Sequence, residues 1–276
     1  MAPFTNPVLQ SFLSVAVPLA VLVLIVHSGL FDSIKVETGY DHYAEPADSK
    51  LGPIPFPSCI KMPANALVNI GYMLVAMYWG IYIFISNNQL TSIQNMDAYL
   101  MYVLVWMMFL YAPVQFARII TQKQEWAILD QWVTLPIFAW VMVTCKTLLT
   151  DWQPKFVVLT ILASLMSYNL VFTMEQGFDI ALLPHIVYAV SASWDLCSKY
   201  TPPGYRRDFG MAVLMCAGFV VLKVCDFHLA QFWIFQELTG HFWSKVCDAL
   251  QAHFALQVLF KVSLIRGARN LAKKLF

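Results

Sequence analysis

The last apolar segment of the chain, Leu238 to Phe260, is long enough to cross a bilayer yet carries three ionisable residues. These residues, His241, Lys245 and Asp248, are spaced i, i+4 and i+7, so they share one face of an α-helix. A lysine at bilayer depth costs roughly 2.5–3.5 kcal/mol, so it requires a protein interior and a polar partner. The segment therefore predicts a helix bundle with a polar interior, and that interior is where function is expected.

The composition places the whole chain in the membrane class. Hydrophobic residues make up 59% of the 276 positions and charged residues 12%, whereas soluble domains carry about 25% charged residues. The formal net charge is +1 and the basic residues are dispersed along the chain, so we expect no nucleic-acid partner. The partners that this composition predicts are membrane lipids.

Eight apolar runs are long enough to be helices that cross a membrane. The first ends near residue 31, has no charged residue, and lacks the basic start and the cleavage site of a signal peptide, so we expect a retained helix. The run at 178–195 is short and bounded by polar residues, so six, seven or eight spans all stay open. The seven later runs cover residues 62–86, 97–119, 129–148, 155–174, 178–195, 208–230 and 239–262.

We expect one all-α integral membrane domain over residues 1–276, because no repeat or long linker divides the chain. Its N-terminal helix, 1–31, is followed by an acidic, proline-rich loop, 32–61, which is expected to be extended and to cover one membrane face. A seven-helix core, 62–262, and a basic tail, 263–276, complete the domain.

The positive-inside rule favours a topology with both termini in the cytoplasm. Ten Lys and Arg residues then lie on the cytoplasmic side and five on the opposite side. The acidic loop faces the lumen or the exterior in this topology. The membrane itself, in the endoplasmic reticulum, the Golgi or the cell surface, is left open.

Under this topology, ionisable residues from several helices fall near one end of the bundle. Such a set could bind a metal, perform acid–base chemistry or simply hold helices together, and a structural network is the plainest of these interpretations. Lys223 with Asp226, and Lys245 with Asp248, could also pair along their own helices. The full set is Arg118, Asp130, Lys223, Asp226, His228, His241, Lys245 and Asp248.

Several strings of the sequence are long and rich in rare residues, so chance is a poor explanation for a match to them. They are Gly29–Ser33 with Gly39–Glu45, Leu129–Trp140, Gly218–Asp226 and Leu238–Asp248. These strings closely resemble the transmembrane protein 187 family, and the similarity runs nearly end to end. The resemblance implies a membrane location and brings no known activity with it.

A more remote resemblance, to a second group of membrane proteins, rests on ionisable residues of three predicted helices. Asp130 before Leu135 and Pro136, together with Asp226 and His241, is similar to motifs of the alkaline ceramidase and adiponectin-receptor superfamily. The resemblance implies a core of seven helices, in which one histidine from the second core helix and a histidine pair from the seventh hold a zinc ion.

The zinc ligands that this superfamily requires are missing here. Lys245 stands where the second histidine of the final pair is expected, and a protonated ammonium group has no lone pair for a metal. The other histidine, expected near the end of the run at 97–119, is replaced by a stretch with Gln115 and Arg118. A catalytic zinc needs about three protein ligands, so we expect neither zinc nor another cofactor.

A retained architecture without its metal ligands predicts a non-catalytic multi-pass protein whose cavity binds a lipid-like ligand or a protein partner. In this hypothesis the positive charge of Lys245 or Arg118 stands near Asp130 and Asp226, where relatives hold zinc. One alternative is a lipid amidase or hydrolase that uses Asp130, Asp226 and His241 as acid–base groups without zinc. The other is a transporter, although no inverted repeat supports it.

Overall fold

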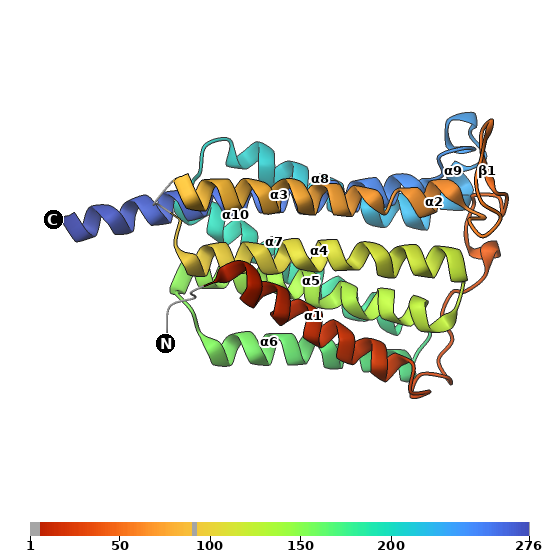
Figure 1. Cartoon of the computed structure of the whole chain (residues 1–276), viewed down its shortest axis with the longest axis horizontal. Coiled ribbons are helices and arrows are strands. Elements are labelled where there is room, and N and C mark those ends of the chain that lie inside the picture. The colour runs from red at the N-terminus through yellow and green to blue at the C-terminus, as the bar shows by residue number, and fades with distance from the viewer. Residues whose placement is uncertain (1–5, 90–92, 276) are drawn as a thin grey trace.

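The computed structural model describes residues 6–89 and 93–275, and this part of the chain is a bundle of long helices lying roughly side by side (Figure 1). The all-α prediction is therefore confirmed. The long helices are α1 (Pro7–Val26), α3 (Ile70–Gln89), α4 (Asn95–Thr121), α5 (Gln124–Thr150), α6 (Pro154–Ser167), α7 (Gly177–Tyr200), α8 (Tyr205–Val224) and α10 (Gly240–Leu275). The short elements are η1 (Tyr40–His42), β1 (Lys50–Leu51), β2 (Ile54–Pro55), α2 (Pro63–Leu67), η2 (Tyr168–Phe172), α9 (Asp226–Leu229) and η3 (Trp233–Phe235).

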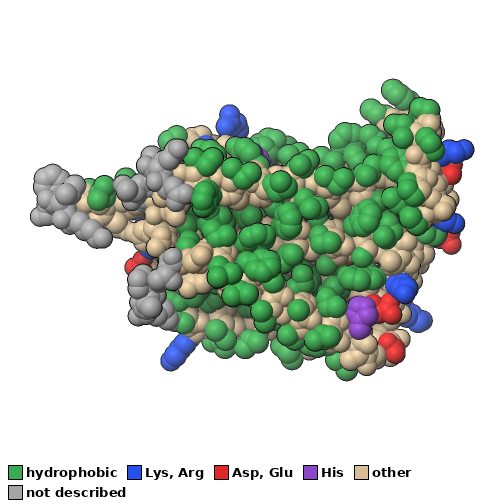
Figure 2. All heavy atoms as spheres, in the orientation of Figure 1, with side chains coloured by type: hydrophobic (Ala, Val, Ile, Leu, Met, Phe, Trp, Pro, Cys, Tyr) green, Lys and Arg blue, Asp and Glu red, His purple; other side chains and the backbone are tan. Residues whose placement is uncertain are grey.

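The outside of the bundle matches the interior of a membrane. Hydrophobic side chains cover the middle of the face seen in Figure 2, and charged side chains gather towards its ends. Large apolar side chains such as Leu24 and Leu159 are 72% and 66% exposed, which suits contact with lipid. By length and composition, α1, α2 with α3, α4, α5, α6 with η2, and α7 can each cross a membrane. Helices α8 and α10 run beside them (Figure 1). These two helices contain more charged residues.

Helix α1 begins, and α10 ends, at the same end of the bundle (Figure 1). The opposite end carries the connection 32–61, which holds η1 and the β1–β2 hairpin, together with α9. We call this connection the cover. Which membrane face it occupies stays a prediction.

Two predicted helix boundaries near the chain's end are wrong. The run at 208–230 is not one helix, because α8 ends at Val224 and Asp226 begins α9. The run at 239–262 continues to Leu275, so the predicted tail starts as helix, in keeping with its high content of Leu, Ala, Arg and Lys. Residues 1–5 and 276 of the predicted termini, and the side chains of residues 273–275, lie outside the described structure.

The run at 62–86 also differs from the prediction, because it is interrupted between α2 and α3. The side-chain amide of Asn69 donates to the carbonyl oxygens of Asn65 and Ala66 at 3.0 and 3.2 Å, competing with the regular helix ladder. By contrast, the run at 178–195, which was expected to be the weakest span, is the full 24-residue helix α7.

Two cations of α10 near the predicted tail are bound to carboxylates of α4 and α8 and to the one that follows α5. Arg266 Nη1 lies 2.6 Å from Asp97 Oδ1, and Arg266 also pairs with Asp151. Lys261 Nζ lies 2.5 Å from Asp208 Oδ2. These pairs fasten the second half of α10 to the bundle at the end away from the cover.

Packing between the helices is uneven. Helix α8 packs chiefly on α10, and α7 packs chiefly on α5, whereas α7 and α8 touch each other sparingly. The line along which α7 faces α8 is therefore a weakly closed part of the bundle. We call this line the α7–α8 seam.

Candidate functional site

A polar cavity of about 690 Å³ lies at the end of the bundle that carries the cover. Helices α4, α5, α7, α8 and α10 contribute its walls, and residues 35–37 and 42–43 of the cover contribute to its lining. We call this cavity the end chamber. Its volume lies within the range of about 300–1,000 Å³ that is usual for small-molecule sites.

Six of the eight ionisable residues selected from the sequence line the end chamber. The other two lie outside it. His228 is exposed near Phe232, and Asp248 lines a smaller neighbouring cavity, where it accepts a hydrogen bond of 2.6 Å from the hydroxyl of Tyr72. The six that converge are Arg118, Asp130, Lys223, Asp226, His241 and Lys245.

Asp130 is bound by three side chains of α4. The hydroxyl of Tyr111 donates to Asp130 Oδ1 at 2.8 Å, and Gln115 and Arg118 also donate to this carboxylate. The pair with Arg118 is buried, since the two side chains are 7% and 5% exposed. The negative charge of Asp130 is therefore compensated by an arginine.

Sequence reasoning did not identify Tyr111 as part of this site. Tyr111, Gln115 and Arg118 are spaced i, i+4 and i+7, which puts them on one face of α4. His241, Lys245 and Asp248 have the same spacing on α10. Applying that criterion to every charged residue would have found this second polar face.

Asp226 connects the cover to the start of α10. Its Oδ2 accepts the backbone N–H of Ala44 at 2.9 Å, and its Oδ1 accepts the backbone N–H of His241 at 2.7 Å. A carboxylate is well placed there because the first N–H groups of a helix lack partners within the helix. Since both oxygens hold backbone groups, the geometry favours a structural role over acid–base chemistry.

This connection requires a close approach between α10 and the end of α8. A Cβ atom added at Gly240 would lie 2.6 Å from the carbonyl oxygen of Leu222 and 2.9 Å from the Cα of Asp226. Any side chain at position 240 would therefore push the first turn of α10 away from Asp226.

The two lysines of the end chamber differ from Arg118. In the described part of the chain, neither Lys223 nor Lys245 forms an ion pair with a carboxylate. Lys245 is only 5% exposed, and its Nζ lies 5.9 Å from the ring centroids of Tyr111 and Phe219, a distance that allows a cation–π contact. The end chamber thus contains two ammonium groups that lack a counter-ion among these residues.

The ion pairs that were considered along single helices do not form. Asp226 lies beyond the end of α8, with both oxygens on backbone N–H groups, so it does not pair with Lys223. Asp248 is bound by Tyr72 and makes no ion pair with Lys245. Of the two cations expected near Asp130, Arg118 is the one that pairs with it.

His241 is buried in the wall of the end chamber, where the ring of Tyr43 packs edge-on against it with a centroid distance of 4.9 Å. Tyr43 belongs to the cover and is itself buried against Met62, Ala66 and Ile119. The cover is therefore packed onto the bundle by this aromatic contact as well as by Asp226.

Glu45 fastens the cover to the first turn of α2. Its two carboxylate oxygens accept the backbone N–H groups of Ala64 and Asn65, each at 2.8 Å. Burial raises the pKa of Glu45 to about 7, and the nearby charges of Asp226 and Glu237 add to the rise, although the two hydrogen bonds oppose it. Glu45 therefore titrates near neutral pH.

The residues of the end chamber do not fit a zinc ion. Within residues 6–89 and 93–275, no group of three or more His, Cys, Asp or Glu side chains could hold a metal ion. Asp130 and Asp226 are bound to protein groups, and protonated Lys245 has no lone pair to offer.

Comparison with known proteins gives one consistent result. The TMEM187 protein family matches residues 11–260. Transmembrane protein 187 of Homo sapiens is 41% identical over 250 residues, which cover 91% of this chain and 91% of that protein. Transmembrane protein 187 of Bos taurus is 40% identical over 260 residues, which cover 92% and 96% of the two chains. No solved structure matches, so the remote resemblance to ceramidases has no support from these comparisons.

Proposed function

Because the chain belongs to the TMEM187 protein family, a family of membrane proteins, we propose that it binds a membrane lipid. The anionic head group of the lipid would lie in the end chamber, and an acyl chain would lie along the α7–α8 seam. The observation that carries this proposal is that two lysines in a chamber inside the bundle form no ion pair with any carboxylate among the described residues.

The head group would supply the charge that the protein does not. Lys245 is almost fully buried, and an ammonium group at bilayer depth costs roughly 2.5–3.5 kcal/mol. A phosphate or carboxylate placed between Lys245 and Lys223 would offset this cost by charge-assisted hydrogen bonds. Asp130 would not compete for the lysines, because Arg118 already neutralises it.

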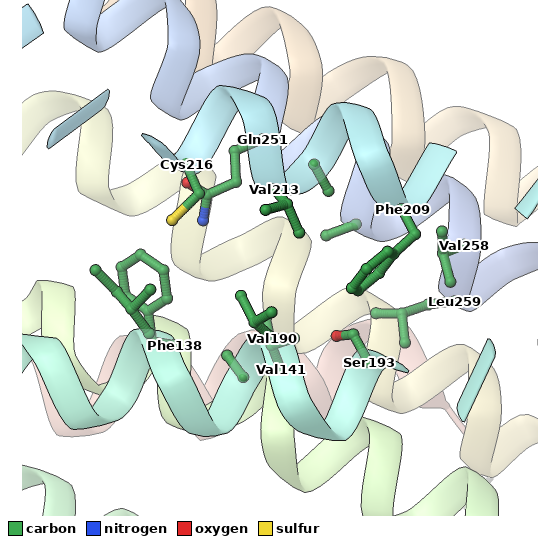
Figure 3. A pocket seen from close by; sticks show the side chains of 14 residues that line it. Phe138, Val141, Val190, Ser193, Phe209, Val213, Cys216, Gln251, Val258 and Leu259 are labelled. Carbon is green, nitrogen blue, oxygen red and sulfur yellow. The ribbon is translucent and has the colours of Figure 1, made fainter. Parts of the chain in front are cut away.

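The α7–α8 seam supplies an apolar path away from the head group. Figure 3 shows side chains of α7, such as Val190, and of α8, such as Val213, around a narrow groove. Its volume is about 50 Å³, and residues of α5 and α10 also line it. The groove is lined by Val190 and Ser193 of α7 and by Val213 and Cys216 of α8, among others. Its mostly apolar lining suits contact with an acyl chain.

The groove and the end chamber form one line along the same two helices. On α7, Phe178 and Leu182 line the end chamber, and the groove continues at Ile186, Val190 and Ser193. The 15 residue-to-residue steps from 178 to 193 span about 22 Å at 1.5 Å per step. This is longer than the roughly 15 Å thickness of one leaflet of the hydrocarbon core. A lipid could thus enter sideways between two helices that touch each other sparingly.

The test is thermal unfolding of the purified, delipidated protein with and without added phospholipid. We expect phospholipid to raise the unfolding temperature of the wild type by several degrees, because a ligand that binds only the folded state stabilises it. The double variant Lys223→Met and Lys245→Met should lose this shift, whereas Lys146→Met, an exposed lysine near the other end of the bundle, should keep it.

A second variant tests the path of the acyl chain. Val190→Trp would fill the groove and reduce the shift, whereas Val187→Trp, on the exposed side of α7, would not. The proposal is wrong if no phospholipid shifts the unfolding temperature of the wild type, or if the double lysine variant responds as the wild type does.

A further inference from the structure

The charges that line the end chamber are arranged in two layers. The inner layer is cationic, with Lys245 almost fully buried and Lys223 half-buried. The outer layer is acidic, because Glu37, Glu175 and Asp179 line the same chamber and are exposed. Glu37 comes from the cover, Glu175 from the turn before α7, and Asp179 from the first turn of α7.

The outer carboxylates are not held in ion pairs: none of the three forms one with any residue that the structure describes. Lys35, also exposed, lines the chamber beside them, so the outer layer keeps two net negative charges, three carboxylates less one ammonium. Glu37 and Asp179 are also close enough to Lys223 to interact with it electrostatically. The two layers therefore lie next to each other.

We infer that the lipid is a zwitterionic phospholipid, with its phosphate on Lys223 and Lys245 and its terminal ammonium group among Glu37, Glu175 and Asp179. This inference rests on the proposed lipid-binding function and specifies its head group. Lys245 anchors the inference, because it is a nearly buried ammonium group without a carboxylate partner that lines the same chamber as the acids.

The order of the two layers agrees with the order of groups in a phospholipid. An acyl chain in the α7–α8 seam leads up to the end chamber, the phosphate follows at the inner lysines, and the amine comes last at the exposed carboxylates. A head group that ends in phosphate would instead face three carboxylates on its outer side, and like charges at close range disfavour binding. Ethanolamine and choline carry the required positive charge equally.

The inference is tested by comparing head groups on identical acyl chains. The full-length protein, purified in a non-ionic detergent, is titrated with phosphatidylethanolamine, phosphatidylcholine and phosphatidic acid, and the affinities are read from native mass spectra. We expect at least one of the two amine lipids to bind wild type tenfold or more tightly than phosphatidic acid does. A preference for either amine lipid supports the inference and identifies the amine.

The double variant Glu175→Gln and Asp179→Asn should remove this preference by weakening the amine lipids while phosphatidic acid binds as well or better. Asp195→Asn, an exposed carboxylate near the other end of α7, should leave the preference unchanged. Equal or tighter binding of phosphatidic acid by the wild type would overturn the inference and leave lipid binding standing. Failure of all three lipids to bind would reject the proposed function itself.

Discussion

Lys245 of α10 and Asp130 of α5 line the same chamber, but in the described structure they do not form an ion pair. Asp130 pairs with Arg118, and the ammonium group of Lys245 lies over the rings of Tyr111 and Phe219. The chamber therefore contains a neutralised carboxylate and, separately, ammonium groups that form no ion pair among the described residues. This separation leads to opposite expectations for the two kinds of cation.

Removing Arg118 should be strongly destabilising. Arg118→Met leaves the carboxylate of Asp130 buried without its counter-ion, and breaking a buried ion pair in this way costs about 3–5 kcal/mol. The additional change Asp130→Asn should recover part of this loss, because it removes the orphaned charge. Chemical unfolding in detergent micelles measures both variants. A loss below about 1 kcal/mol for Arg118→Met would show that the pair does not hold α4 to α5.

Removing Lys245 should have the opposite effect on the empty protein. Lys245→Met takes away a buried charge that has no carboxylate partner, so we expect the free energy of unfolding to stay the same or to rise by about 1–3 kcal/mol. Thermal unfolding of delipidated protein checks this directly. A clear decrease in stability would mean that Lys245 does neutralise Asp130 after all.

The contact between α8 and α10 gives a steric prediction. Gly240→Ala places a methyl group 2.6 Å from the carbonyl oxygen of Leu222, so the first turn of α10 must shift, at a cost of about 1–3 kcal/mol. Gly210→Ala is the matched control. Its methyl group meets nothing within 4 Å inside α8, and alanine favours a helix, so stability should rise by up to about 1 kcal/mol. Equal effects of the two changes would contradict the close approach.

Much of this architecture could be predicted from the sequence. Long apolar runs identify the helices, and the i, i+4, i+7 spacing of His241, Lys245 and Asp248 locates a polar interior on α10. Proline content also separates the cover from the helices. The helix interruptions were missed because they depend on local bonds, such as those of Asn69, that hydrophobic periodicity does not report.

The partners of each charge could not be predicted in the same way. Asp226 is close to Lys223 in the sequence, which suggested an ion pair between them. Instead, Asp226 binds the backbone N–H groups of Ala44, far earlier in the chain, and of His241, which follows it. Such long-range pairings depend on how the cover folds over the bundle. Arg118 differs from Asp226, because the sequence already predicted that Lys245 or Arg118 lies near Asp130. The structure shows which of the two cations forms the ion pair.

The attachment of the cover should depend on pH through Glu45. Its pKa is raised to about 7 in the folded protein from an ordinary value of 4.5, so folding favours the protonated form. The stability contributed by this group is full below about pH 4.5 and is lost as pH rises through 7. The difference in unfolding free energy between wild type and Glu45→Gln should therefore fall between pH 5.5 and pH 8. A difference that grows over this range would show that the bonds from Ala64 and Asn65 keep the carboxylate ionised.

The most direct test of lipid binding is native mass spectrometry of the protein as it is purified from membranes in a mild detergent. We predict one phospholipid bound to each wild-type chain, with at least a tenfold lower bound fraction in the double variant Lys223→Met and Lys245→Met and no change in Lys146→Met. A wild-type chain that carries no phospholipid, or a double variant that retains it fully, would contradict a lipid site in the end chamber.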